Sequence, residues 1–238
     1  MSNPIFITLA FSLAFLIESV FGFGGTIFAI SILAFFIDIK EIIFIAFLAA
    51  SFSSVVNFLT GLKTGHFNKK HFIKLIIPSS FGVVLGAYFL HQFSSDLLLY
   101  LFAGFLVFFA IWSLVDKNYK FPWLIEKILI FGGGIITGIF GGGGPFAVLV
   151  TKQAIKHKTE IRATLAGFFV AQNLIRAVQY SWQQTFDMSK ILDIWWFFIP
   201  LALAISLGYK IHLAISEKLF QKTTAILLLL AGVSLFFK

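Results

Sequence analysis

The sequence Gly141-Gly142-Gly143-Gly144-Pro145 decides the fold, because it interrupts an apolar segment that runs from Ile128 to Phe140 and resumes from Phe146 to Val150. Each glycine inside a helix costs about 1 kcal/mol relative to alanine, so a run of glycines does not sustain a helix. Proline fits the first turn of a new helix, where its missing N–H is not needed. The stretch therefore predicts a helix, a tight turn and a second helix whose N-terminus, a feature that attracts anions, lies inside a membrane.

A similar interruption occurs earlier in the chain, at Gly22-Phe23-Gly24-Gly25-Thr26, where Gly22 lies 119 residues before Gly141. At the same spacing, Ser54 and Asn57 correspond to Asn173 and Arg176. A glycine-broken segment at the same place in both halves of a chain indicates a transporter binding site. Glycines also occur where helices pack closely, and this alternative stays open for each cluster.

The composition is that of an integral membrane protein. The 238 residues are 59% hydrophobic and only 12% charged, with a mean hydropathy of +0.98, whereas about 25% of a soluble domain is charged. We expect a multi-pass protein of the cell membrane, the inner or plasma membrane, with the lipid bilayer as its surroundings. The absence of cysteine excludes disulfides and thiolate metal sites, and no histidine pair has metal-ligand spacing, so we expect no metal and no cofactor.

The net charge of +8 is typical of membrane topology signals and does not indicate nucleic-acid binding, since the Lys and Arg residues lie in short loops between apolar runs. Basic loops face the cytoplasm. We therefore expect four loops that carry most of these residues to lie inside, namely 61–74, 116–127, 152–162 and 209–222.

Each half contains five apolar runs. In both halves, the run that follows the glycine cluster is too short to span a bilayer. If the broken segments are re-entrant helical hairpins, three transmembrane helices remain per half. Because the number of transmembrane helices per half is odd, the second half has the opposite orientation in the membrane to the first. The predicted fold is therefore an all-α integral membrane protein of two homologous repeats in inverted topology, residues 1–118 and 119–238. The alternative, in which each broken segment crosses once, places the basic residues of 152–162 outside and is disfavoured.

The chain resembles the TauE/SafE family of membrane transporters, also called the sulfite exporter or TSUP family. The resemblance covers essentially the whole chain and includes the glycine-rich break in each half. It also includes the stretch Glu160-Ile161-Arg162-Ala163-Thr164-Leu165, followed by Gln172-Asn173. Membership implies movement of small sulfur-containing anions, such as sulfite or sulfonates, and of other organic anions in some members.

The candidate site combines the two breaks with polar residues inside predicted spans, where polar side chains are costly and usually face the protein interior. Gln172, Arg176 and Gln179 have helical spacing and predict one polar face, with Asn173 beside it. We expect the substrate to contact Gly24, Gly25, Thr26, Ser54, Asn57, Gly143, Gly144, Pro145, Gln172, Asn173 and Arg176.

Alternatives stay open for the individual side chains. Arg176 is close enough in sequence to Tyr180 and Trp182 for its head group to reach the membrane interface. The Ser and Asn residues are equally suited to hydrogen bonds between helices. Glu18, one turn before the first break, is a candidate proton-coupling carboxylate, or else a partner of Arg176 or an anchor near the surface.

The sequence predicts a secondary transporter of a small anion, a sulfur oxyanion or an organosulfonate. It would work by alternating access around a midplane site between the two breaks. A passive anion channel and a membrane scaffold or assembly protein are the alternatives. An enzyme is not expected, because no histidine or cysteine lies deep in a span, and no ATP-binding motif is present. We expect no nucleic-acid partner, and the sequence leaves a homo-oligomer open.

Overall fold

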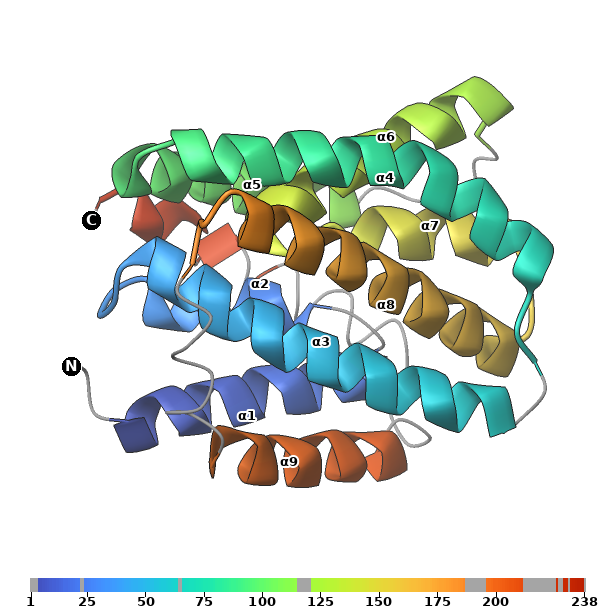
Figure 1. Cartoon of the computed structure of the whole chain (residues 1–238), viewed down its shortest axis with the longest axis horizontal. Coiled ribbons are helices and arrows are strands. Elements are labelled where there is room, and N and C mark those ends of the chain that lie inside the picture. The colour runs from blue at the N-terminus through green and yellow to red at the C-terminus, as the bar shows by residue number, and fades with distance from the viewer. Residues whose placement is uncertain are drawn as a thin grey trace.

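The computed structural model describes residues 4–21, 24–63, 66–114, 121–186, 196–211, 226, 229–230 and 232–237, and these residues contain no β-strand. Figure 1 shows α4 and α6 along one side, α1 and α9 along the other, and α3 and α8 between them. The helices in chain order are α1 (Pro4–Phe21), α2 (Gly25–Leu33), α3 (Ile39–Lys63), α4 (Lys69–Gln92), α5 (Ser95–Leu114), α6 (Trp123–Phe140), α7 (Gly144–Ala154), α8 (Lys158–Trp182) and α9 (Phe198–Ile211).

The first two helices form a helical hairpin. At its tip, the N–H of Gly25 donates to Oε2 of Glu18 at 3.0 Å. At its open end, the ring of Phe6 near the start of α1 lies edge-on to the ring of Phe36 after α2, with centroids 5.1 Å apart. The chain therefore enters and leaves this hairpin at the same end of the helix bundle.

Helices α6 and α7 form a second hairpin around the glycine cluster. Helix α6 ends at Phe140, α7 begins at Gly144, and Pro145 lies in its first turn, as predicted from the sequence. Near the tip, a methyl group on Gly133 would lie 2.8 Å from Cβ of Phe146. At the open end, the N–H of Phe121 donates to Oε1 of Gln153 at 3.2 Å.

The two hairpins open toward opposite ends of the bundle. Helices α3 and α8 run antiparallel, because Phe47 contacts Tyr180 near one end and a methyl group on Gly61 would lie 2.9 Å from Cβ of Ala163 near the other. Helix α2 leads directly into the start of α3, so the first hairpin opens at that end. The second opens beside the start of α8, at the end where α3 finishes.

Glycines bring the helices of the two halves into close contact. Gly82 and Gly86 on α4 face Gly134 and Gly138 on α6, and a methyl group on any of the four would meet backbone of the facing helix. This is the small-residue spacing that lets membrane helices approach closely. Gly208 plays a comparable part between α9 and α1, where a methyl group would lie 2.7 Å from Cβ of Ser19.

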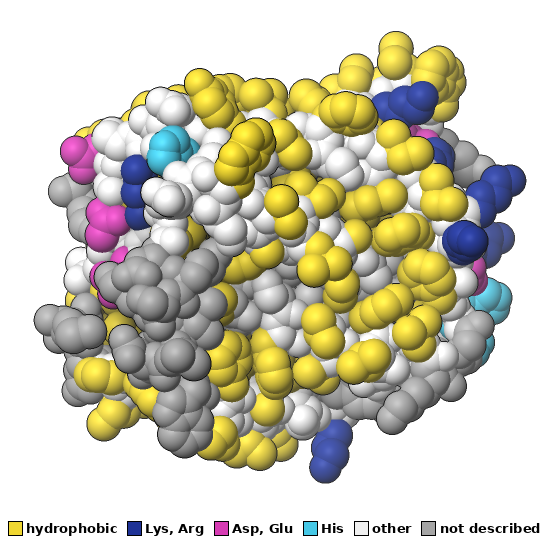
Figure 2. Space-filling view, viewed as in Figure 1, with side chains coloured by type: hydrophobic (Ala, Val, Ile, Leu, Met, Phe, Trp, Pro, Cys, Tyr) yellow, Lys and Arg dark blue, Asp and Glu magenta, His cyan; other side chains and the backbone are white. Residues whose placement is uncertain are grey.

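The described residues include four helices that are long and apolar enough to cross a membrane, 39–62, 69–92, 95–112 and 123–140. Large hydrophobic side chains cover much of the face in Figure 2, as expected for a surface in contact with lipid. Two of the apolar runs of the second half that the sequence predicts to span the membrane, 191–207 and 223–237, fall partly outside the described residues. Within the first of them, α9 begins at Phe198.

Lys and Arg side chains gather at the right-hand edge in Figure 2, where α4, α6 and α8 begin. Lys74, Lys127 and Lys156 are among the exposed ones. The basic loops 61–74 and 152–162 therefore share one end of the bundle in their described parts, which agrees with the predicted placement on one side of the membrane. Most of the loop 209–222 lies outside the described residues.

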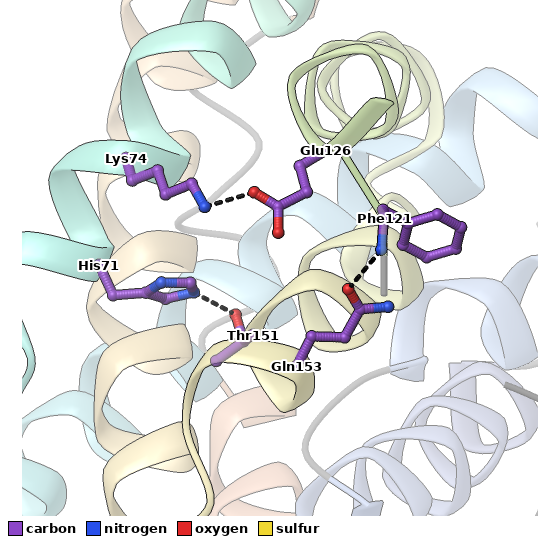
Figure 3. A network of polar contacts seen from close by, with 6 residues as sticks. All are labelled: His71, Lys74, Phe121, Glu126, Thr151 and Gln153. Atoms are coloured by element: carbon purple, nitrogen blue, oxygen red, sulfur yellow. Dashed lines mark hydrogen bonds and ion pairs between the residues drawn. The ribbon is translucent and has the colours of Figure 1, made fainter. Parts of the chain in front are cut away.

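At this basic end, polar contacts attach the second hairpin to α4 (Figure 3). Lys74 on α4 forms an ion pair with Glu126 on α6. Nε2 of His71 on α4 and Oγ1 of Thr151 on α7 are hydrogen-bonded at 3.1 Å. Both helices of the hairpin are therefore connected to the same neighbour at their open end.

Candidate functional site

Two glycines give the breaks their backbone geometry. Gly24, which precedes α2, has a φ of 102°, and Gly141, which follows α6, has a φ of 77°. Both values lie in the left-handed region, which is accessible to glycine at little cost and strained for most other residues. The N–H of Gly141 donates to the carbonyl of Thr137 at 2.8 Å, closing the last turn of α6.

The tips of the two hairpins touch. A methyl group on Gly141 would lie 3.2 Å from Cγ2 of Thr26, and one on Gly142 would lie 2.9 Å from Cγ1 of Ile27. Thr26 and Ile27 belong to the first turn of α2, before the first intrahelical bond from Phe28 N–H to Gly24 O at 2.9 Å. The N-terminus of α2, which carries partial positive charge, therefore faces the second break.

Arg176 on α8 lies where the tips meet. Its side chain is 0% exposed, so it does not extend to the membrane surface. Nε donates to the hydroxyl of Tyr180 at 3.0 Å, and Nη1 donates to Oδ1 of Asn173 at 3.2 Å. The guanidinium also lies over the ring of Phe47, 5.2 Å from its centroid.

The guanidinium of Arg176 can donate further hydrogen bonds. Nη2 is buried and has no hydrogen-bond partner among the described residues. No carboxylate among the described residues forms an ion pair with Arg176, whereas Lys74 and Glu126 do form one. A buried charge without a partner is strongly destabilising, which makes an anion the natural complement of this group.

The unused edge of Arg176 faces the second break. A methyl group on Gly141 would lie 2.9 Å from Nη1 and 3.2 Å from Nη2. Tyr180 links the same arginine to α6, because its hydroxyl donates to the carbonyl of Gly138 at 2.8 Å. Neither Tyr180 nor Gly141 was among the predicted ligands. The spacing of four residues between Arg176 and Tyr180 was the available signal for the tyrosine.

A second polar cluster surrounds the half-buried Glu18 at the tip of the first hairpin. Its Oε2 accepts the N–H of Gly25 at 3.0 Å, and its Oε1 accepts the hydroxyl of Ser53 at 2.8 Å. Asn57 donates to the carbonyl of Ser53 at 2.9 Å and accepts from Nη2 of Arg162 at 3.1 Å. Glu18 is therefore held by α2 and α3 and is not the partner of Arg176.

The two clusters are neighbours on α3. Ser53 belongs to the Glu18 cluster, whereas Oγ of Ser54 accepts from Nδ2 of Asn173 at 3.3 Å. The structure thus brings Ser54, Asn173 and Arg176 together, and Thr26 and Arg176 both lie beside Gly141. The bond between Asn173 and Ser54 joins α8 to α3, so the helix-contact alternative also describes these two residues.

Other predicted residues lie elsewhere. Gln172 turns to α4 and donates to Oγ of Ser79 at 3.1 Å, while Gln179 borders a surface hollow that Ser80 and Tyr88 also line. The polar residues of α8 therefore do not form the single face that the sequence predicts, because α8 packs against both α3 and α4.

Three predicted ligands at the second break are buried within its own hairpin. Gly143 precedes α7 and packs against the carbonyl of Gly133 on α6. Gly144 and Pro145 form the buried first turn of α7. It is Gly141 and Gly142 that contact α2.

The sequence model of the sulfite exporter TauE/SafE family matches residues 7–235. The chain belongs to this family. It is therefore a multi-pass membrane transporter and not an enzyme, and family membership implies an anionic substrate, sulfite or a related anion. No curated protein and no solved structure matches the chain.

The charges at the hairpin tips are suited to the anionic substrate that TauE/SafE membership implies. A helix N-terminus and a guanidinium nitrogen that lacks a partner in the described part of the chain both attract negative charge, and here both lie beside Gly141. The nearest acidic side chain at the tips, Glu18, is already bonded to Gly25 and Ser53. The arrangement is suited to hold a small oxyanion by direct hydrogen bonds.

Proposed function

We propose that this chain is a secondary transporter of a sulfur oxyanion or an organosulfonate, and that the substrate binds between the two hairpin tips. One observation carries the proposal. Arg176 is fully buried, its Nη2 has no hydrogen-bond partner among the described residues, and both its guanidinium and Thr26 at the start of α2 lie beside Gly141.

Electrostatics supports an anion at this position. A charged group inside a membrane is costly, so a buried arginine without a protein counter-ion is best stabilised by a bound anion. The guanidinium is planar and matches the oxygens of an oxyanion. The first-turn amides of α2 add further donors close by, as helix N-termini do for phosphate and sulfate.

We further propose that residues 1–118 and 119–238 are inverted repeats with re-entrant hairpins. In support, the hairpins open toward opposite ends, and the first helix of each half packs on the fourth helix of the other, α1 on α9 and α6 on α4. Transporters built this way bind substrate at the repeat interface and expose it alternately to the two sides.

The proposed ligands fall into an inner and an outer group. Thr26, Ser54, Asn173 and Arg176 surround the contact between the tips and form the inner group. The outer group supports the breaks or closes around a substrate after rearrangement, and it comprises Gly24, Gly25, Asn57, Gly143, Gly144, Pro145 and Gln172. Glu18 is the proposed proton-coupling carboxylate, since it lies at the first tip within the membrane-spanning bundle.

Uptake into proteoliposomes tests this proposal. The purified chain is reconstituted, and the entry of radiolabelled sulfite, thiosulfate and sulfoacetate is measured over a range of concentrations. We expect saturable uptake of at least one of them, abolished in Arg176→Gln and retained in Lys156→Gln, which removes an exposed positive charge outside the site.

The outcomes separate the candidate functions. Uptake that rises without saturation identifies a passive channel. Folded protein that moves none of the three anions contradicts the proposal and favours a scaffold or assembly role. Uptake that is unchanged in Arg176→Gln contradicts the proposed site.

A further inference from the structure

The carboxylate of Glu18 occupies donors that an anionic substrate would use. Gly25 is the first residue of α2, and its N–H is one of the amides that α2 presents beyond its own hydrogen-bond ladder. That N–H donates to Oε2 of Glu18 at 3.0 Å, while the hydroxyl of Ser53 donates to Oε1 at 2.8 Å. A carboxylate bound by an amide and a hydroxyl at a helix N-terminus imitates a bound oxyanion.

The space around this carboxylate is tight. A methyl group on Gly25 would lie 2.7 Å from Oε2 of Glu18 and 3.0 Å from Cδ1 of Phe15. The next residue of α2, Thr26, contacts the second break beside Arg176. The glutamate and an anion at Arg176 therefore lie at adjacent residues of the same helix terminus, where two negative charges repel one another.

In the part of the chain that the structure describes, no charged side chain forms an ion pair or hydrogen bond with Glu18. Helix α2 has no charged residue, and α3 contributes the neutral Ser53 and Asn57. Helix α8 contributes Arg162, whose Nη2 bonds the carbonyl of Ser19 at 3.3 Å and Oδ1 of Asn57 at 3.1 Å. Helix α9 presents Gly208 to α1, and its charged residue, Lys210, is exposed.

We propose that Glu18 is an internal competitor of the substrate: its carboxylate holds Gly25 and Ser53 in the empty transporter, and an anion binds when Glu18 has taken up a proton and released them. This inference rests on the proposed function. The proton comes from solvent and forms the neutral carboxylic acid, which is a weaker acceptor for an amide N–H and no longer repels the anion. Proton and anion then bind together and cross together.

The proposal makes a quantitative statement about affinity. Above the pH at which Glu18 loses its proton, the binding of each anion requires the uptake of one proton. By linkage, the apparent dissociation constant then rises about tenfold for each pH unit. Below that pH the affinity is constant.

Equilibrium binding of radiolabelled thiosulfate and sulfoacetate to the full chain in detergent tests this, because the charge of each anion stays constant between weakly acidic and weakly alkaline buffers. We expect wild type to bind more weakly as pH rises. Glu18→Gln, which is permanently neutral, should bind with the acidic-pH affinity throughout. Glu41→Gln, which removes an exposed acid in the first turn of α3, should keep the wild-type profile.

Two further measurements keep the result decisive. Glu18→Ala should also lose the pH dependence, so the conclusion does not depend on one variant folding. In wild-type proteoliposomes, entry of the anion should alkalinise the exterior, as a pH-sensitive dye reports. A pH profile in both variants that matches wild type, or uptake without proton movement, overturns the competitor role while leaving anion transport intact. Wild type that binds neither these anions nor sulfite at any pH contradicts the proposed function itself.

Discussion

The guanidinium of Arg176 lies against the backbone of Gly141, so that a methyl group on this glycine would be 2.9 Å from Nη1 and 3.2 Å from Nη2. The arginine belongs to α8, the glycine follows the end of α6, and Thr26 of α2 also lies beside this glycine. This contact is where the two breaks and the buried charge come together.

Gly141→Ala should therefore damage both the backbone and the site. The φ of 77° costs a residue with a side chain about 1 to 2 kcal/mol, and the added methyl displaces the guanidinium. We expect a lower midpoint of thermal unfolding and at least a tenfold loss of anion affinity. Gly104→Ala is the control, since no described residue outside its own helix turn comes within 4 Å of the added methyl. Wild-type affinity in Gly141→Ala would show that the contact is unimportant.

Tyr180→Phe tests how Arg176 is held. The hydroxyl accepts from Nε of Arg176 and donates to the carbonyl of Gly138, so its removal leaves two buried groups without a partner. Such a loss costs about 1 to 3 kcal/mol, part of which should appear as weaker binding of sulfite or thiosulfate. Tyr88→Phe, at a half-exposed position on α4, should bind normally. Equal affinities in the two variants would contradict a positioning role for Tyr180.

Ser53→Ala should change the pH dependence of binding. The variant removes one of the two donors to the Glu18 carboxylate, which weakens the competitor in its charged form. Because the neutral acid does not compete, anion affinity should rise in alkaline buffer and stay unchanged in acidic buffer. Ser51→Ala is the matched control, since that hydroxyl donates to the carbonyl of Phe47 within its own helix. A uniform change at every pH would instead indicate a structural effect.

Gly134→Ala should destabilise the contact between α4 and α6 without touching the site. The methyl would meet the carbonyl of Ser79 on α4, and overpacking of this kind costs about 1 to 3 kcal/mol. Gly132→Ala lies two residues earlier on the same helix, and among the described residues its methyl would meet no neighbouring segment within 4 Å, so stability should be unchanged or raised. Unfolding in detergent followed by circular dichroism distinguishes them. Equal unfolding midpoints would contradict the packing role.

The parts of the fold that depend on local chemistry could be predicted from the sequence. The glycine run and Pro145 stop one helix and begin another by their own backbone preferences, and the structure confirms the boundaries at Phe140 and Gly144. The sequence also indicates Arg176 as a site residue, because an arginine deep in an apolar span is costly wherever it points.

The contacts between distant segments could not be predicted in this way. Periodicity places Gln172 and Arg176 on one face of α8. It does not predict that Gln172 bonds to a residue of α4, or that Arg176 bonds to Asn173 and Tyr180. The bond from Gly25 to Glu18 depends on how tightly α2 folds back on α1. Which glycines of the second break touch α2 depends on how the two hairpins approach, and no residue spacing within either hairpin encodes that.

The most direct test of the central claim is to locate the bound anion. Selenite, the heavier analogue of sulfite, can be soaked into crystals of the chain and found by its anomalous scattering. The account predicts a peak within hydrogen-bond distance of Nη2 of Arg176, beside Gly141 and the start of α2, and no such peak in Arg176→Gln. A peak at another place in the bundle, with Nη2 still unpartnered, would contradict it.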